Sequence, residues 1–241
     1  MKGTTPEGAR TEQEAAAWVR GMFGRVAPRY DLANHLLSFN IDRYWRAHTA
    51  NRVRDILENP EARVLDVCCG TGDLVRALSR RRRNGAPVMG ADFCHPMLVA
   101  AAAKLPRAGL FEADALQLPL ADGSLDLITA AFGFRNLANY EAGLREMRRV
   151  LHAGGGAAIL EFSQPPNPLF GGLYTFYSRR ILPLVGGALS GSQDAYTYLP
   201  ESVRKFPGPE ELAGMMRACG FSRVDFERLT GGIVALHIGR V

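Results

Sequence analysis

Short apolar runs alternate with amphipathic stretches through most of the chain. The apolar runs fall at residues 63–68, 87–93, 108–114, 125–134 and 156–163. Runs of this length, bounded by glycine, proline or polar positions, are typical of buried strands. Hydrophobic residues at helical spacing follow several of them, as in DLVRALSRR, LVAAAAKL and residues 139–151. This alternation predicts a parallel sheet with helices on both faces.

Further helices are expected before the first strand. Thr11 and Glu14 have the spacing of a capping box, and an apolar stripe at helical spacing follows them. A second helix is expected to start at Asp42. The sequence therefore predicts that residues 1–60 form a helical cap in front of the α/β core.

The second half of the chain departs from the alternation twice. Residues 164–207 are rich in proline, glycine and aromatic side chains, which predicts an insertion rather than a part of the core. Residues 221–229 and 233–241 have the pattern of two strands joined by a glycine pair, which predicts a terminal hairpin. The whole chain, residues 1–241, is expected to form a single domain.

Composition narrows the class of protein. The chain is 47% hydrophobic and 22% charged, which is ordinary for a soluble globular domain. It has no apolar run long enough to span a membrane and begins with polar residues, so a cytoplasmic location is expected. The four cysteines and five histidines lack metal-ligand spacing, so we expect no metal and no disulfide framework. The net charge of +5 favours anionic partners without choosing between RNA and lipid.

The first candidate site is a glycine turn after the first strand. The segment VLDVCCGTGD places Asp66 at the strand end and Gly70 and Gly72 in the turn, where the missing side chains let the backbone approach a ligand. The segment resembles motif I of class I methyltransferases, although Cys68 replaces its first glycine. Taken alone, it could also be an ordinary tight β–α connection.

Acidic residues at the ends of the next two strands extend this site. Asp92 follows the turn at the spacing of a carboxylate that accepts both ribose hydroxyls, and taken alone it could instead cap a helix. Asp114 and Ala115 end the third strand, where the methyltransferase fold holds adenine; Asp114 alone could be a plain loop residue. An NAD enzyme would share the acid at Asp92. The absence of G-x-G-x-x-G and the terminal hairpin favour a methyltransferase.

Several segments together resemble the menaquinone and ubiquinone C-methyltransferase family. They are FGRVAPRYDLANHLLSFNIDRYWR, LDVCCGTGD, FGFRNL, LREMRRVLHAGG, LEFSQP and YTYLPESVRKFPGPEELAGMMRACGF. The resemblance runs from about Met22 to the end of the chain, and three of the segments lie outside the generic methyltransferase motifs.

This resemblance implies a class I fold, in which a Rossmann-like, seven-stranded α/β sheet ends in an antiparallel hairpin. It also implies S-adenosyl-L-methionine as cofactor, with contacts at Thr71, Asp92, Asp114 and Ala115. The implied reaction is C-methylation of a polyprenyl quinol ring, demethylmenaquinol to menaquinol. Some members that act on ubiquinone precursors carry a serine contact where this chain has Ala131, which favours menaquinone alone.

The chemistry requires a group that stabilises a phenolate. A quinol ring carbon becomes nucleophilic when the neighbouring hydroxyl loses its proton, and a phenol is mostly protonated at neutral pH. Arg135 and Asn136 follow the fourth strand, whose carboxyl end faces the ligand crevice, and could hold the oxyanion. Arg135 could equally form a loop ion pair. The proton could pass through water to Asp31, Tyr30 or His35, and the sequence does not choose.

The isoprenoid tail of such a substrate needs apolar surface. The insertion offers ten apolar or aromatic residues, with Arg179 and Arg180 between them: Leu169, Phe170, Leu173, Tyr174, Phe176, Tyr177, Ile181, Leu182, Leu184 and Val185. With the N-terminal helix, this segment is expected to form a lid and tail channel. Arg80 to Arg83 could attract anionic lipid at the inner face of the membrane. A local core and a favourable helix dipole are the alternatives for these two features.

The expected partner is a polyprenyl quinol, without nucleic acid, and both a peripheral contact with the membrane surface and a homo-oligomer are left open. The rivals are a methyltransferase for a benzoquinol ubiquinone precursor, for another small molecule or for RNA. A nucleotide-binding module without catalysis and an NAD oxidoreductase are rivals of a different class. Binding of S-adenosylhomocysteine rather than NAD separates them.

Overall fold

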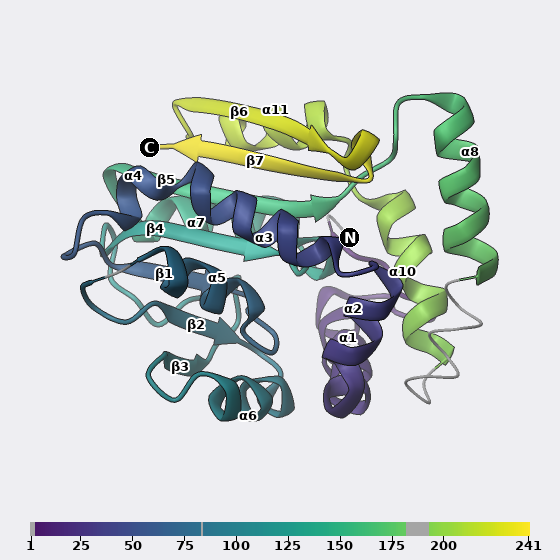
Figure 1. Ribbon diagram of the computed structural model, residues 1–241, viewed down its shortest axis with the longest axis horizontal. Helices are drawn as coiled ribbons and strands as arrows, with labels where there is room; N and C mark the ends of the chain where they lie inside the picture. The colour runs from purple at the N-terminus through teal and green to yellow at the C-terminus, as the bar shows by residue number, and fades with distance from the viewer. Residues whose placement is uncertain (1–2, 83, 182–192) are drawn as a thin grey trace.

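The computed structural model describes residues 3–82, 84–181 and 193–241 (Figure 1). Its helices are α1 (Glu12–Val26), α2 (Tyr30–Leu37), α3 (Ile41–Arg52), α4 (Arg54–Leu57), α5 (Asp73–Arg81), α6 (His95–Lys104), α7 (Tyr140–Val150), α8 (Pro168–Phe176), α10 (Gln193–Lys205) and α11 (Pro209–Ala218). Its strands are β1 (Val64–Val67), β2 (Met89–Asp92), β3 (Gly109–Glu112), β4 (Leu125–Ala131), β5 (Leu151–Phe162), β6 (Arg223–Leu229) and β7 (Val234–Arg240).

Within the described residues the strands form one seven-stranded sheet in the order β3-β2-β1-β4-β5-β7-β6. Strands β1 to β5 are parallel, and β7 lies antiparallel between β5 and β6. Gly231 and Gly232 turn the chain between β6 and β7 with φ of 67° and 95°, a region that glycine enters without steric cost. The predicted parallel sheet and terminal hairpin are confirmed.

Helices cover both faces of the sheet. In Figure 1, α3, α4 and α5 lie on the near face, and α7 and α11 lie behind it. Successive residues of β1 alternate between two apolar clusters: Leu65 and Val67 pack with α7 and α11, whereas Val64 packs with α3 and α5. A strand buried on both faces has to be apolar at nearly every position, which explains the continuous apolar runs of the sequence.

The N-terminal helices and α10 gather at the carboxyl ends of the parallel strands (Figure 1). The predicted capping box starts α1: Thr11 Oγ1 accepts from the backbone N–H of Glu14 at 3.1 Å, and Glu14 Oε2 accepts from that of Thr11 at 3.1 Å. Helix α1 packs on both α6 and α10. These helices therefore enclose the edge of the sheet where open α/β folds bind ligands.

The two largest differences between predicted and observed strand boundaries lie in β4 and β5. Strand β4 ends at Ala131 rather than at Phe134, because Phe132 takes a left-handed φ of 59° and a 3-10 turn, Phe134–Asn136, follows. Strand β5 starts at Leu151 rather than at residue 156, because Leu151 already pairs with Leu125 directly after α7. The chain therefore turns sharply at the end of β4, beside the predicted site.

The insertion contains α8 and α10, and α8 has no buried residue. Leu182, Leu184 and Val185, which were predicted to line a tail channel, lie outside the described residues, as do Arg83 and the side chains of Arg179 and Ile181. No helix in the described ranges is both long and apolar enough to cross a bilayer.

Candidate active site

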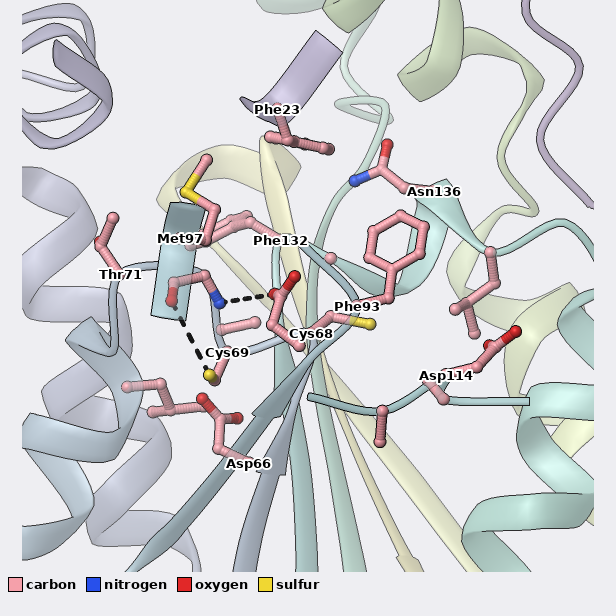
Figure 2. Close-up of a pocket in the computed structure, with 18 of the residues that line it drawn as sticks. Phe23, Asp66, Cys68, Cys69, Thr71, Phe93, Met97, Asp114, Phe132 and Asn136 are labelled. Atoms are coloured by element: carbon pink, nitrogen blue, oxygen red, sulfur yellow. Dashed lines mark hydrogen bonds between the residues drawn. The ribbon is translucent and has the colours of Figure 1, made fainter. Parts of the chain in front are cut away.

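A cavity lies over the carboxyl ends of β1, β2 and β4, and most of the predicted site residues line it (Figure 2). Its wall includes the four predicted cofactor residues and one of the two predicted catalytic residues: Thr71, Asp92, Asp114, Ala115 and Asn136. Ala131, the position at which the resemblance implies a serine in some family members, also lines it. The structure thus brings together side chains that stand up to 65 residues apart in sequence, from Thr71 to Asn136.

The glycine turn keeps backbone, rather than side chains, at the cavity wall. Gly70 and Gly72 have φ of 54° and 83°, and Cys68, at the first glycine of the motif, takes a left-handed φ of 52°. A Cβ built on Gly70 would meet no protein atom within 4 Å, so the space before it is open. A Cβ on Gly133 would lie 2.4 Å from that of Cys68. Strained backbone of this kind is common at ligand sites.

Asp92 fixes this turn from the neighbouring strand. Its side chain is buried, and Oδ2 accepts from the Gly70 N–H at 2.8 Å while Oδ1 accepts from the Cys94 N–H at 2.9 Å. Burial raises the pKa of Asp92 above its ordinary value. A carboxylate has about four lone-pair sites, so acceptor capacity remains for a ligand in the cavity. The N-cap residue of α6 is Cys94 rather than Asp92, and the Cys94 side chain makes no capping hydrogen bond.

The charged residues that line the cavity are mostly acidic. Four carboxylates border it, from Asp66, Asp73, Asp92 and Asp114, and among its described lining residues Arg46 alone is cationic. Asp66 is 1% exposed and accepts from Thr129 Oγ1 at 2.6 Å, and burial raises its pKa to about 7. A ligand that carries positive charge would favour the ionised form of these acids. The site therefore fits a cationic nucleoside better than a free nucleotide phosphate.

A second, larger cavity of about 570 Å³ adjoins the first. Both are lined by Phe23, Tyr30, Arg46 and Phe132. The rest of its wall comes from α1, α2, α3, α8, α10, the end of β5 and the turn between β6 and β7, and it is mostly apolar or aromatic. A charged nucleoside and an apolar second ligand would therefore meet at the shared residues.

Arg135 lines the second cavity rather than the first. Its Nη1 donates to Glu161 Oε1 at 3.0 Å and to the carbonyl of Phe132, and its Nε donates to Ser202 Oγ at 3.3 Å. Glu161 is 1% exposed. Arg135 therefore forms an ion pair, which was the alternative to its predicted role in holding the oxyanion. Its side chain nevertheless borders the second cavity. Asn136 is separate from it and accepts from the Tyr198 hydroxyl at 3.0 Å.

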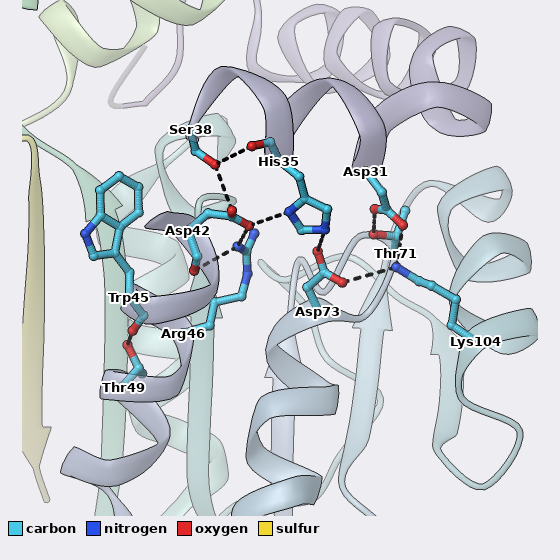
Figure 3. A network of polar contacts seen from close by, with 10 residues as sticks. All are labelled: Asp31, His35, Ser38, Asp42, Trp45, Arg46, Thr49, Thr71, Asp73 and Lys104. Carbon is cyan, nitrogen blue, oxygen red and sulfur yellow. Dashed lines mark hydrogen bonds and ion pairs between the residues drawn. The ribbon is translucent and has the colours of Figure 1, made fainter. Parts of the chain in front are cut away.

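A polar network connects the helical cap with the glycine turn (Figure 3). The Thr71 hydroxyl donates to Asp31 at 2.5 Å, and Lys104 Nζ donates to Asp31 at 2.6 Å and to Asp73 at 3.2 Å. His35 Nδ1 lies 2.9 Å from Asp42 Oδ2. Of the three candidate proton acceptors, Tyr30 lines both cavities, whereas Asp31 and His35 are in neither lining.

The same network contains the groups that come closest to a metal site in the described part of the chain. Ligand atoms of His35, Asp42 and Asp73 lie within 4.8 Å of one another. Arg46 already pairs with Asp42, and Lys104 with Asp73, so both carboxylates have cationic partners. That the protein binds no metal therefore stays a prediction.

Two residues of the site were not singled out by the sequence. Glu161 stands at the end of an apolar strand, and an acid at such a position indicates a buried partner. Arg46 stands in the segment DRYWR before the core, where only the packing of α3 on the sheet brings it to the cavities. The resemblance included both segments without assigning these residues a role.

Known proteins match this chain over most of its length. It is 50% identical over 222 residues to a demethylmenaquinone methyltransferase from Thermus thermophilus, and the match covers 90% of this chain and 99% of that protein. It is 45% identical over 232 residues to a demethylmenaquinone methyltransferase from Deinococcus radiodurans, which covers 95% and 94% of the two chains.

Solved structures share the fold at low identity. A possible histamine N-methyltransferase from Thermotoga maritima superposes with a TM-score of 0.66 at 18% identity and covers 91% of this chain and 98% of that one. The [4+2]-cyclase SpnF superposes with a TM-score of 0.63 at 18% identity and covers 98% of each. These likenesses establish the predicted class I methyltransferase fold, on which different chemistries occur.

The family follows from a match along nearly the whole chain. A model of the ubiE/COQ5 methyltransferase family matches residues 9–241, which include both cavities and every predicted site residue. The two relatives above, which are 50% and 45% identical to this chain, support the same family. The chain belongs to the ubiE/COQ5 methyltransferase family.

Proposed function

We propose that this protein uses S-adenosyl-L-methionine to methylate a ring carbon of a polyprenyl quinol, and that the substrate is demethylmenaquinol. The observation that carries the proposal is the pair of adjoining cavities, one bordered by four carboxylates and one large and apolar. The names of the relatives from Thermus thermophilus and Deinococcus radiodurans support the choice of substrate.

The first cavity has the donor set that this cofactor needs. Asp92 offers acceptor sites for ribose hydroxyls, and Asp114 and Ala115 border the region expected to hold adenine. Thr71 and Gly70 border it at the turn, where the space in front of Gly70 is open. When bound, S-adenosyl-L-methionine supplies an electrophilic methyl group on a cationic sulfur, and the acidic wall suits that charge.

The second cavity has the size and the lining for a quinol ring with part of an isoprenoid tail. Aromatic side chains at the junction, Phe23, Tyr30 and Phe132, suit a flat ring. Pro168, Tyr174 and Thr175 belong to α8 and form part of the outer wall, so the tail would leave beneath that helix. This is the role we propose for the insertion and for the N-terminal cap, which together enclose the cavity.

The chain's own contribution to the reaction is to hold the quinol oxygen as a phenolate. We propose that Arg135, which borders the second cavity, and Asn136, which borders the first, supply this charge stabilisation. An arginine cannot act as the base, because it stays protonated. Asp31 and His35 lie outside both linings, so the proton is proposed to leave through water.

Tyr30 should act as a hydrogen-bond donor to the quinol oxygen. Burial raises the pKa of Tyr30 above its ordinary value, so it stays protonated at neutral pH. Replacing it by phenylalanine should lower kcat about 10-fold, the contribution of one hydrogen bond to a charged group. The two pH–rate profiles should run parallel from about pH 6 to about pH 9. A deficit that grows with pH would assign Tyr30 the role of base instead.

The exposed face of α8 is the proposed contact with a membrane surface. Leu169, Leu173 and Phe176 share one side of the helix and are 86%, 66% and 59% exposed. Phe39, whose ring centre lies 6.5 Å from that of Tyr177 directly after α8, is 76% exposed. The sequence has no acidic residue between Glu161 and Asp194, so nothing in this stretch repels anionic lipid.

Flotation with vesicles of phosphatidylcholine and phosphatidylglycerol tests this contact. Leu173→Glu should weaken vesicle binding about 10-fold, since it removes one apolar anchor and adds a charge. Val99→Glu is the matched control, because Val99 is 58% exposed on α6, away from α8 in Figure 1. Equal binding by both variants would contradict the assignment. Light scattering of the wild type would show whether α8 instead covers a second copy of the chain.

Product analysis tests the proposed reaction itself. The purified protein should transfer labelled methyl groups to a short-chain demethylmenaquinol, and mass spectrometry should place the label on a ring carbon. A short-chain benzoquinol and RNA, offered in parallel, should remain unlabelled. Methylation of the benzoquinol would extend the substrate class, and labelling of RNA alone would reject the proposal.

A further inference from the structure

The ligand cavity contains one cation among four acids. Asp66, Asp73, Asp92 and Asp114 line it, and Arg46 is the single positively charged residue among its described lining residues. The cofactor of the proposed function carries a sulfonium, an ammonium and a carboxylate. The acids suit the first two groups, whereas the carboxylate would be repelled by most of this wall.

We propose that Arg46 binds the carboxylate of the methionyl group of S-adenosyl-L-methionine. The proposal rests on the proposed function for the identity of the cofactor. Arginine suits this role because its planar guanidinium can donate two parallel hydrogen bonds to a carboxylate. Nothing in the family resemblance assigns this residue.

The position of Arg46 is fixed by its surroundings. The residue is 9% exposed, and its guanidinium carbon lies 5.1 Å from the centre of the Phe132 ring, which belongs to both cavities. Its hydrogen bonds within the described ranges use one nitrogen: Nη1 donates to Asp42 Oδ2 at 2.5 Å and to the Asp42 carbonyl at 3.2 Å. The N–H groups of Nε and Nη2 therefore remain for a ligand.

Asp42 acts as a positioning residue for this guanidinium. Its carboxylate also accepts from Ser38 Oγ at 2.7 Å and lies 2.9 Å from His35 Nδ1 (Figure 3). Ser38 contacts Oδ1, whereas His35 contacts Oδ2, the same oxygen as Arg46, so three side chains fix the position of the carboxylate. A rigid partner lowers the entropy that Arg46 loses when a ligand binds.

Two ligands that differ only in the amino-acid part test the assignment. S-adenosylhomocysteine carries the carboxylate, whereas 5′-methylthioadenosine keeps the nucleoside and the sulfur without it. In calorimetric titrations, Arg46→Met should weaken S-adenosylhomocysteine binding about 10-fold or more, the effect of a lost hydrogen bond to a charged group. Binding of 5′-methylthioadenosine should stay within about 2-fold of the wild type.

Two further variants complete the experiment. Arg43→Met is the matched control, because Arg43 is exposed on the same helix and lines an outer groove rather than this cavity. It should leave both affinities unchanged. Arg46→Lys keeps the charge without the planar donor pair and should give an intermediate loss for S-adenosylhomocysteine alone.

The outcomes separate this inference from the proposed function. If wild-type protein does not bind S-adenosylhomocysteine, the proposed cofactor is wrong. If it binds and Arg46→Met weakens both ligands equally, or neither, the assignment of Arg46 is overturned. A raised KM for the quinol with unchanged S-adenosylhomocysteine affinity would also overturn it, and would place Arg46 against the second cavity's ligand instead.

Discussion

Replacing Asp92 with alanine should abolish the heat of S-adenosylhomocysteine binding, which corresponds to a loss of affinity of about 100-fold or more. Two effects add: the ribose hydroxyls lose a charged acceptor, and the Gly70 N–H loses the carboxylate that fixes the turn. NAD should give no heat with the wild type or with the variant. Calorimetric titration of both ligands into both proteins measures this.

The control must separate binding from stability, because Asp92→Ala also leaves the buried N–H of Cys94 without its partner. Asp126 provides a match: its Oδ2 accepts from the Arg63 N–H at 2.7 Å, yet it stands at the start of β4, outside the cavity lining. Asp126→Ala should lower the unfolding temperature while leaving ligand binding intact. Retained binding in Asp92→Ala would refute the role of this carboxylate.

Replacing Arg135 with alanine should lower turnover about 100-fold or more and leave the affinity for S-adenosylhomocysteine nearly unchanged. The reason is location, since Arg135 lines the quinol cavity but not the cofactor cavity. Steady-state kinetics with a short-chain demethylmenaquinol, together with the calorimetric titration, provide the two readouts. Unchanged turnover would reject the charge-stabilising role.

The ion pair with Glu161 complicates the Arg135 variant. Removing one partner of a buried pair typically costs about 3–5 kcal/mol, because the other charge stays behind without compensation. The double variant Arg135→Gln with Glu161→Gln avoids this cost, since two amides replace two charges. It should fold, bind S-adenosylhomocysteine and still be slow. Full activity of this double variant would show that the pair serves stability alone.

Much of the fold could be predicted because its strands are buried on both faces. Leu65 and Val67 pack on one side of β1 and Val64 on the other, and such a strand appears in the sequence as an unbroken apolar run. The position of Asp92 could be predicted for a related reason. In a parallel sheet, residues that end neighbouring strands meet at one edge, so sequence spacing indicates proximity.

The remaining features depend on contacts that no local pattern encodes. Arg135 lies in the 3-10 turn after β4, and Glu161 lies near the end of the neighbouring strand β5, so their pairing requires the sheet order and the turn at Phe132. The place of Arg46 depends on how α3 packs on the sheet, which helical periodicity alone does not specify.

For α8, in the insertion, the sequence likewise does not tell which side of the helix is buried. Its apolar residues were expected to form a channel, but Tyr174 lines the cavity while Leu169 and Leu173 face outward. An apolar helix shows no polar stripe that would tell which side is buried. The direction of each side chain therefore follows only once the packing of α8 is known.

A crystal structure of the protein with S-adenosylhomocysteine tests the central claim most directly. We expect the nucleoside in the cavity over the ends of β1 and β2, with its ribose against Asp92 and its sulfur directed toward the larger cavity. A nucleoside bound at any other place, or this cavity left empty at saturating ligand, would contradict the account.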